Sequence, residues 1–148
     1  MNGRLHANEN MNKQAILRDF IETVWNQGKI DAIPDFIAAQ YHIEHDPGDP
    51  WDGQRLDVAG FQNRVAQSRA PVPDQCFDIQ ALFDSDDSVC MTWLWHGTHL
   101  GEIAGIPPSG KTLRMSGATV YRFDGQRISG HWQVADRLGV FQQLQANR

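Results

Sequence analysis

Apolar residues recur at helical spacing near the start of the chain. They follow the i, i+3, i+4, i+7, i+8 order of a single stripe on one helix: Leu17, Phe20, Ile21, Val24 and Trp25. The stripe predicts a helix that begins at Met11, and Gly28 can end it in a left-handed cap.

Three further helices are indicated by capping residues and by spacing. Asp31 can cap a short helix whose first turn tolerates Pro34, because a missing N–H there removes no helical hydrogen bond. Another helix is predicted to begin near Asp57 and must end before Pro71. The last segment, DRLGVFQQL, carries Leu138, Phe141 and Leu144 at helical spacing and predicts a C-terminal helix.

After the third helix the period of the pattern changes from 3.6 to 2. Residues 77–83, 88–100, 113–123 and 127–135 read as strands, and the turn-forming stretches DSDD, GIPPSGK and FDGQ separate them. Helices followed by a strand meander predict an α+β fold with a mostly antiparallel sheet. We expect one domain over residues 11–148, preceded by a polar, frayed segment at 1–10.

Some of these strands are apolar on both faces. In 88–100 the alternation places Trp93 and Trp95 on one face and Leu94 on the other. In 127–136, Trp132 and Val134 share a face with Asp136, and the opposite face carries His131, Gln133 and Ala135. A sheet that buries both faces suggests a homodimer or tetramer through its outer side. The aromatic side chains are as suited to lining a cavity as to filling a core.

Composition excludes several classes of partner. The 148-residue chain has a net charge of −5 and no Lys/Arg cluster that could follow a phosphate backbone, so we expect no nucleic-acid partner. No apolar run approaches the ~20 residues of a membrane span. Cys76 and Cys90 are too few for a disulfide framework. The first residues show no apolar core of a signal peptide, so a cytoplasmic location is expected.

The spacing H-x-x-H occurs twice, in YHIEHDP at His42 and His45 and in HGTH at His96 and His99. Both segments read as extended chain, and residues three apart on a strand point to opposite faces. Neither pair can then chelate one ion, so we predict no metal site. A lone histidine near a strand end most often bonds a backbone carbonyl.

The carboxylate of Asp136 is the sharper signal. It lies where the last strand meets the terminal helix, on the face of Trp132 and Val134. As an N-cap it would accept backbone N–H bonds and stabilise the helix by about 1 kcal/mol. In an apolar hollow its pKa would instead rise, which suits proton transfer at neutral pH. The two roles are compatible.

The motifs together resemble the SnoaL-like polyketide cyclase family, within the nuclear-transport-factor-like cone fold. The resemblance is carried by FIETVWNQGKIDAIPDFIAAQYHIEHDP, WLWHGTHLGEIAGIPPSGK and YRFDGQRISGHWQVADRLGVFQQL, which cover most of residues 15–145. It implies a curved antiparallel sheet wrapped round a long first helix, with shorter helices closing a conical cavity. It also implies an aspartate acid/base for an intramolecular aldol ring closure, with neither metal nor organic cofactor.

The resemblance implies a set of site residues. Asp136 corresponds to the family's acid/base, and His45 and His99 to positions that face the cavity and could donate to a developing oxyanion. Trp93, Trp95, Met115 and Trp132 would hold a folded substrate, with His131 and Gln133 ranked after them. A tyrosine-based oxyanion hole would have to use Tyr41 or Tyr121, and Tyr121 alternates with Thr119 in a position that is more often core.

Three functions therefore stay open. The first is a cofactor-free cyclase, lyase or isomerase that acts on an oxygenated apolar small molecule. The second is binding of a lipophilic ligand in the same cavity without turnover. The third is a dimeric interaction module in which the outer sheet face matters.

Overall fold

The computed structural model describes residues 13–148, so the predicted frayed segment at 1–10 lies outside the described residues. Helical residues 13–20 continue into a π-helical stretch, η1 (Ile21–Asn26). The remaining elements follow in the order η2 (Ile30–Asp35), β1 (Ile37–His45), β2 (Arg55–Leu56), α2 (Val58–Arg69), β3 (Cys76–Asp84), β4 (Ser88–Thr98), β5 (Thr112–Asp124), β6 (Arg127–Ala135) and α3 (Arg137–Ala146).

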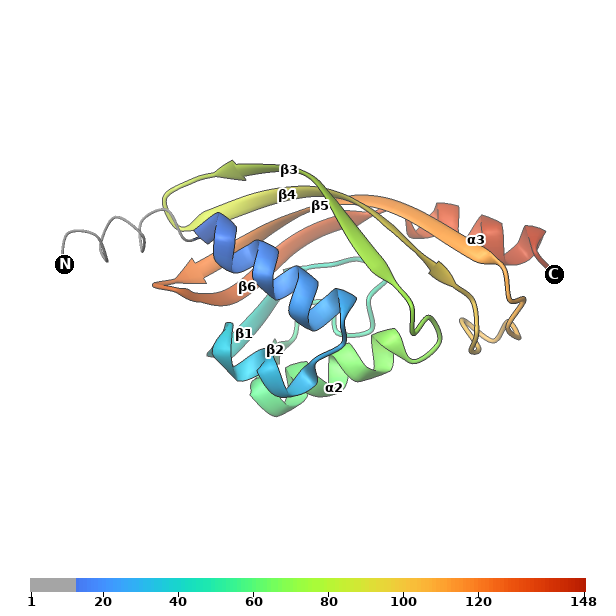
Figure 1. Ribbon diagram of the computed structural model, residues 1–148, viewed down its shortest axis with the longest axis horizontal. Coiled ribbons are helices and arrows are strands. Elements are labelled where there is room, and N and C mark those ends of the chain that lie inside the picture. The colour runs from blue at the N-terminus through green and yellow to red at the C-terminus, as the bar shows by residue number, and fades with distance from the viewer. Residues whose placement is uncertain (1–12) are drawn as a thin grey trace.

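The strands form one curved six-stranded sheet in the order β2-β1-β6-β5-β4-β3 (Figure 1). Pairing is antiparallel except between β1 and β6, which run parallel. The predicted α+β class and mostly antiparallel sheet are therefore confirmed. The sheet does not close, because β2 and β3 at its two edges do not pair with each other.

The core fills the concave side of the sheet. The first helix crosses that side and α2 lies below it (Figure 1). The predicted apolar stripe of the first helix is buried, with Leu17, Phe20 and Val24 fully covered. Phe20 meets Phe61 of α2 and Tyr121 of β5 at ring-centroid distances of 6.1 Å each. Edge and tilted contacts of this kind add to the stabilisation from burial.

The second predicted helix is a short 3-10 helix that contains Asp31 and Pro34, and β1 begins at Ile37, soon after it ends. The predicted helix near Asp57 is α2, whose N-cap Asp57 accepts a 2.7 Å hydrogen bond from Gly60 N–H. The YHIEHDP stretch is extended, as expected, and its first part runs beside the last strand of the meander.

A β-bulge in β6 decides which side chains face inward. Arg122 of β5 pairs with Gly130, whereas the next residue, Phe123, pairs with Ile128, so Ser129 is left without a partner on β5. The inserted residue lets both Ile128 and His131 be buried on the concave side. Beyond the bulge, His131 and Gln133 turn inward and Trp132 and Val134 turn outward.

The prediction that Trp132 and Asp136, on a face shared with Val134, line the cavity is therefore wrong. Strict alternation from the buried Ile128 would have placed these side chains on the concave face. The extra residue in the bulge reverses the face on which each later residue of β6 lies. Trp132 and Val134 are 40% and 45% exposed.

The convex face of the sheet keeps several apolar side chains in solvent, among them Leu94, Trp132 and Val134. Assembly through this face stays a prediction. Within residues 13–148, no helix is both long and apolar enough to cross a membrane.

Candidate active site

A cavity of about 530 Å³ opens between the concave face of the sheet, α2 and α3. Most of its wall is apolar, and the apolar lining residues include side chains from the first helix, β3, β4, β5 and α3: Trp25, Phe77, Trp93, Trp95, Met115 and Leu144. Gly117 on β5 makes room for Trp93, because a Cβ at Gly117 would lie 2.3 Å from the indole ring. A flat or chain-like apolar molecule of modest size fits such a wall.

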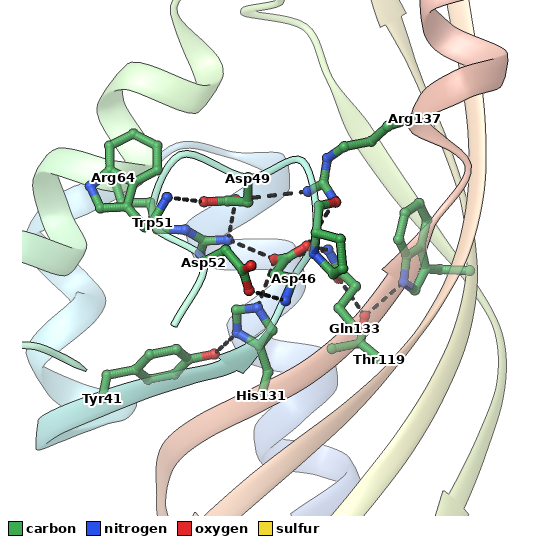
Figure 2. Close-up of polar contacts among 12 residues, drawn as sticks. Tyr41, Asp46, Asp49, Trp51, Asp52, Arg64, Thr119, His131, Gln133 and Arg137 are labelled. Atoms are coloured by element: carbon green, nitrogen blue, oxygen red, sulfur yellow. Dashed lines mark hydrogen bonds and ion pairs between the residues drawn. The ribbon is translucent and has the colours of Figure 1, made fainter. Parts of the chain in front are cut away.

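Polar side chains gather around Asp46 (Figure 2), and three of its partners, His131, Gln133 and Arg137, line the cavity. Asp46 follows the last residue of β1 and its side chain is fully buried. His131 Nε2 and Arg137 Nη1 each lie 2.8 Å from one of its carboxylate oxygens, and Gln133 Nε2 lies 3.1 Å away. Its backbone N–H donates to Asp52 Oδ1 at 2.6 Å.

A second carboxylate and two arginines complete the charge balance. Asp49 accepts a 2.9 Å bond from Arg64 Nη2, which also lies 3.4 Å from Asp46 Oδ2. Arg137 Nη2 lies 3.8 Å from Asp49. Two acids thus face two arginines, and a buried carboxylate is tolerated only with such compensation. Arg64 is also held by the Trp25 ring, whose centroid lies 5.3 Å from the guanidinium carbon.

The ionisation of Asp46 follows from its partners. Burial alone would raise the pKa of the Asp46 carboxyl, but the hydrogen bond from His131 and the charge of Arg137 outweigh it and hold that pKa below its ordinary value. Asp46 is therefore a carboxylate at neutral pH and can only accept hydrogen bonds.

His131 lies between Asp46 and Tyr41, and its tautomer can be deduced. Burial lowers the pKa of His131, so the ring is neutral at pH 7. A neutral ring that faces a carboxylate through Nε2 carries its proton there, which leaves Nδ1 as an acceptor. The Tyr41 hydroxyl, 2.6 Å from Nδ1, must then be the donor. The result is a directional chain from Tyr41 through His131 to Asp46.

Two tyrosines flank His131 on the cavity wall. The rings of Tyr41 and Tyr121 lie 5.6 and 6.0 Å from the imidazole, centroid to centroid. Burial raises the pKa of both phenols, so both are protonated at neutral pH. Tyr41 donates its proton to His131, whereas the Tyr121 hydroxyl has no hydrogen-bond partner among residues 13–148 and can donate to a bound molecule.

A row of hydrogen bonds fixes Gln133 beside the carboxylate. Trp93 Nε1 donates to Thr119 Oγ1 at 2.9 Å, and Thr119 donates to Gln133 Oε1 at 2.5 Å. The Gln133 amide nitrogen is thereby turned toward Asp46 (Figure 2). The apolar wall and the polar cluster around Asp46 are thus coupled through three adjacent strands.

The structure brings together some of the residues predicted from the sequence. Trp93, Trp95, Met115, His131 and Gln133 all line the cavity. Their roles toward a substrate stay predictions. Tyr121, which by pattern is more often core, lines the cavity as well.

The other predicted residues lie elsewhere. Asp136 is exposed and caps α3, where its Oδ1 accepts a 2.9 Å bond from Gly139 N–H. His45 stacks on Trp132, with the ring centroids 4.6 Å apart, and neither residue lines the cavity. The expectation that Asp136, His45 and Trp132 face the hollow is therefore wrong. The bulge turns Trp132 and the end of β6 outward, and His45 lies on β1 beyond a register shift between Ile43 and His45.

His99 is fully buried but does not line the cavity. Its Nδ1 accepts a 3.3 Å bond from Ser109 N–H, so it holds the loop that follows β4. Its placement beside a bound molecule is likewise not supported.

Sequence reasoning missed four residues of the polar cluster, Asp46, Asp49, Arg64 and Arg137, and it considered Tyr41 only for an oxyanion hole. One signal was present for Arg64, which interrupts the apolar stripe of α2 at the helical spacing of Phe61 and Val65. A charge within a buried stripe indicates a buried partner. Asp46 lies in the YHIEHDP stretch, but the stretch drew attention for its histidines.

The arrangement can move protons and stabilise negative charge. The chain from Tyr41 to Asp46 can take up one proton as an imidazolium, which the ionised carboxylate stabilises. Tyr121 and Arg137 carry hydrogen-bond donors, and both residues line the cavity.

Comparisons with known proteins agree with one another. The pattern of the family described as SnoaL-like polyketide cyclase matches residues 15–144. A crystal structure of a protein from Acidithiobacillus ferrooxidans, assigned as a polyketide cyclase, is 55% identical, with 92% of this chain and 96% of that chain covered and a TM-score of 0.89. No curated protein sequence matches significantly.

More distant structures share the fold. IdmH from Streptomyces antibioticus, also assigned as a polyketide cyclase, is 26% identical over 90% of this chain and 98% of its own, with a TM-score of 0.75. A SnoaL-like protein from a Jannaschia species is 16% identical over 93% and 94% of the two chains, with a TM-score of 0.79, and shows the fold alone.

Proposed function

The chain belongs to the SnoaL-like polyketide cyclase family, and we propose that it closes a ring in an oxygenated apolar small molecule by proton transfer through Tyr41, His131 and Asp46. One observation carries this proposal: an apolar cavity ends at a neutral histidine whose two ring nitrogens are bonded to a phenol and to a buried carboxylate. The family relationship supports the general kind of reaction.

The reaction proposed is an intramolecular aldol addition that needs neither metal nor organic cofactor. The substrate carries an acidic methylene next to a carbonyl, and a second carbonyl folds back on it. The methylene proton passes to the Tyr41 oxygen while the Tyr41 proton passes to His131 Nδ1. The resulting imidazolium is stabilised by Asp46, 2.8 Å away. Tyr41 and His131 are the catalytic residues, and Asp46 is a positioning residue.

The enolate then forms the new carbon–carbon bond. Its oxygen is stabilised by the Tyr121 hydroxyl and by Arg137, which line the cavity. The enolate carbon attacks the second carbonyl and produces an alkoxide. That alkoxide takes the stored proton back through Tyr41, and His131 becomes neutral again. The indoles of Trp93 and Trp95 hold the chain folded during the reaction.

Proton abstraction can be tested without the natural substrate. 2-Tetralone is a small, apolar ketone with acidic protons at C1, and their exchange for deuterium in D₂O is followed by ¹H NMR. We expect the wild-type protein to accelerate the exchange over buffer. Tyr41→Phe and His131→Gln should reduce the acceleration by on the order of 10²-fold, the usual contribution of a general base.

The matched control is Asp136→Asn, which alters an exposed carboxyl outside the cavity. It should leave exchange unchanged. The proposal fails if Asp136→Asn abolishes exchange, or if His131→Gln retains it. If 2-tetralone quenches the tryptophan fluorescence but wild type gives no acceleration, the cavity binds without turnover and the second of the three functions applies.

A further inference from the structure

Outside the cavity, three side chains on the convex face of the sheet bring together ligands that metal ions use. Cys76 and Asp78 lie on β3 and His96 lies on β4. One ligand atom from each residue lies within 4.8 Å of the other two. This is a grouping of a thiol, a carboxylate and an imidazole, and not merely a cluster of acids.

Strand register explains why these residues meet. Cys76 is the direct cross-strand partner of His96, and Asp78 is two residues further along β3 on the same face. Directly opposed and diagonal residues on one face of an antiparallel pair lie within reach of each other. The neighbours Phe77 and Trp95, also directly paired, point to the opposite, concave face and line the cavity.

The distances suit a small tetrahedral ion. His96 Nε2 lies 3.5 Å from Asp78 Oδ2, and Cys76 Sγ lies 3.8 Å from Asp78 Oδ1. Nitrogen, oxygen and sulfur ligands around Zn²⁺ lie on the order of 3.3–3.6 Å apart when bond lengths are about 2.0–2.3 Å. The two contacts use different oxygens of Asp78, and side-chain rotations would bring the three ligand atoms, which lie within 4.8 Å of one another, to such separations.

Access and charge also suit a cation. The side chains of His96 and Asp78 are 41% and 56% exposed, so an ion can enter and a water molecule can occupy the fourth position. A metal ion that binds Cys76 displaces the thiol proton to the solvent as the sulfur–metal bond forms.

We infer that Cys76, Asp78 and His96 bind one divalent transition-metal ion of the Zn²⁺ type, with three protein ligands and one open position. Thiolate and imidazole ligands favour such ions over Mg²⁺ or Ca²⁺. The site differs from the expectation of no metal drawn from H-x-x-H spacing, because it takes one histidine from the HGTH motif together with residues of another strand. It is independent of the proposed cyclase reaction.

Cobalt spectroscopy on the full, tag-free chain under reducing conditions tests the inference. Co²⁺ bound to a thiolate in tetrahedral geometry gives a near-ultraviolet charge-transfer band and intense visible bands. We expect both at one Co²⁺ per chain, and we expect Zn²⁺ to displace them. Competition with Zn²⁺ then yields the affinity for each variant.

The variants assign the ligands. Cys76→Ser should abolish the charge-transfer band, and His96→Gln and Asp78→Asn should weaken Zn²⁺ binding by roughly tenfold or more. Cys90→Ser is the matched control, because Cys90 lies on the same face of β4 without such neighbours among residues 13–148. Circular dichroism and the thermal midpoint without metal should match wild type in all four.

Three results would overturn the site. The first is the absence of a thiolate band in wild type. The second is a band that survives Cys76→Ser and disappears in Cys90→Ser. The third is a stoichiometry of one ion per two chains, which would place the ion between copies. 2-Tetralone exchange should be unchanged in Cys76→Ser, so the test is separate from that of the cyclase proposal.

Discussion

Asp46 and Asp136 are two aspartates with contrasting surroundings. Asp46 is fully buried and receives hydrogen bonds from His131, Gln133 and Arg137. Asp136 is exposed and accepts one bond from the backbone of its own helix. The two are connected, since Asp136 caps the helix whose first residue, Arg137, reaches Asp46.

The comparison separates two uses of a carboxylate. At a helix N-terminus the group interacts with partial charges in water, so its contribution is small and almost any small polar residue can replace it. In a buried cluster the same group compensates whole charges, and its removal leaves those charges unpaired. The buried group can also fix a histidine tautomer, which is a chemical role that an exposed cap does not have.

The largest expected effect is that of Asp46→Ala on stability. Removing the carboxylate takes away the closest ion-pair partner of Arg137 and leaves Asp49 alone against both arginines. We expect the free energy of unfolding to fall by about 3–5 kcal/mol, the usual result of breaking a buried ion pair. Urea unfolding followed by tryptophan fluorescence measures the change. A loss no greater than that of Asp136→Ala would show that the arginines find other partners and would remove the contrast.

The next prediction concerns the loss of folding stability at acidic pH. Burial lowers the pKa of His131, so below about pH 6.5 the unfolded chain binds a proton that the folded chain does not. Stability must then fall as the pH decreases from about 6.5 toward the folded pKa, by up to ~1.4 kcal/mol per pH unit. Asp46, whose pKa is also lowered, adds a second loss below about pH 4 as the folded state resists protonation.

Midpoints of urea unfolding between pH 4.5 and 7.5 measure the loss of stability that is due to His131. His131→Gln should flatten the dependence in that range, whereas His42→Gln, which removes a half-buried histidine outside the cluster, should not. An unchanged slope in His131→Gln would mean that His131 is not kept neutral by its site.

Much of the fold could be predicted from the hydrophobic periodicity of the sequence and from its turn-forming residues. The stripe from Leu17 to Trp25 is buried as expected, and the four meander strands and the helix after Asp57 form where the pattern places them. Local rules suffice for these elements because burial on one face and turn residues at the ends act within a few residues. The parallel pairing of β1 with β6 depends on residues about ninety positions apart, so no local pattern reveals it.

The site residues were harder to predict than the fold, because a register shift of one residue determines which side chains of β6 face the cavity. The bulge at Ser129 has no sequence signal of its own, yet it exchanges the face of Trp132 and Asp136 with that of His131 and Gln133. Alternation grouped Trp132 with Val134 and His131 with Gln133 correctly, but it could not show that only His131 and Gln133 face the cavity. Asp46 was missed for a different reason: its partners come from α2, β6 and α3, and only the folded chain brings them together.

The smallest expected effect belongs to Asp136. Asp136→Ala removes the cap of α3 and should lower the free energy of unfolding by about 1 kcal/mol, and Asp136→Ser should restore most of it because a hydroxyl also accepts from the Gly139 N–H. Urea unfolding measures both. Exchange of 2-tetralone should stay within about twofold of wild type, because Arg137 keeps its second hold on the Pro47 carbonyl at 2.7 Å. If Asp136→Ala instead lost exchange activity while its stability was unchanged, the proton-transfer role would belong to the exposed Asp136 carboxyl. Asp46 would then have only a structural role.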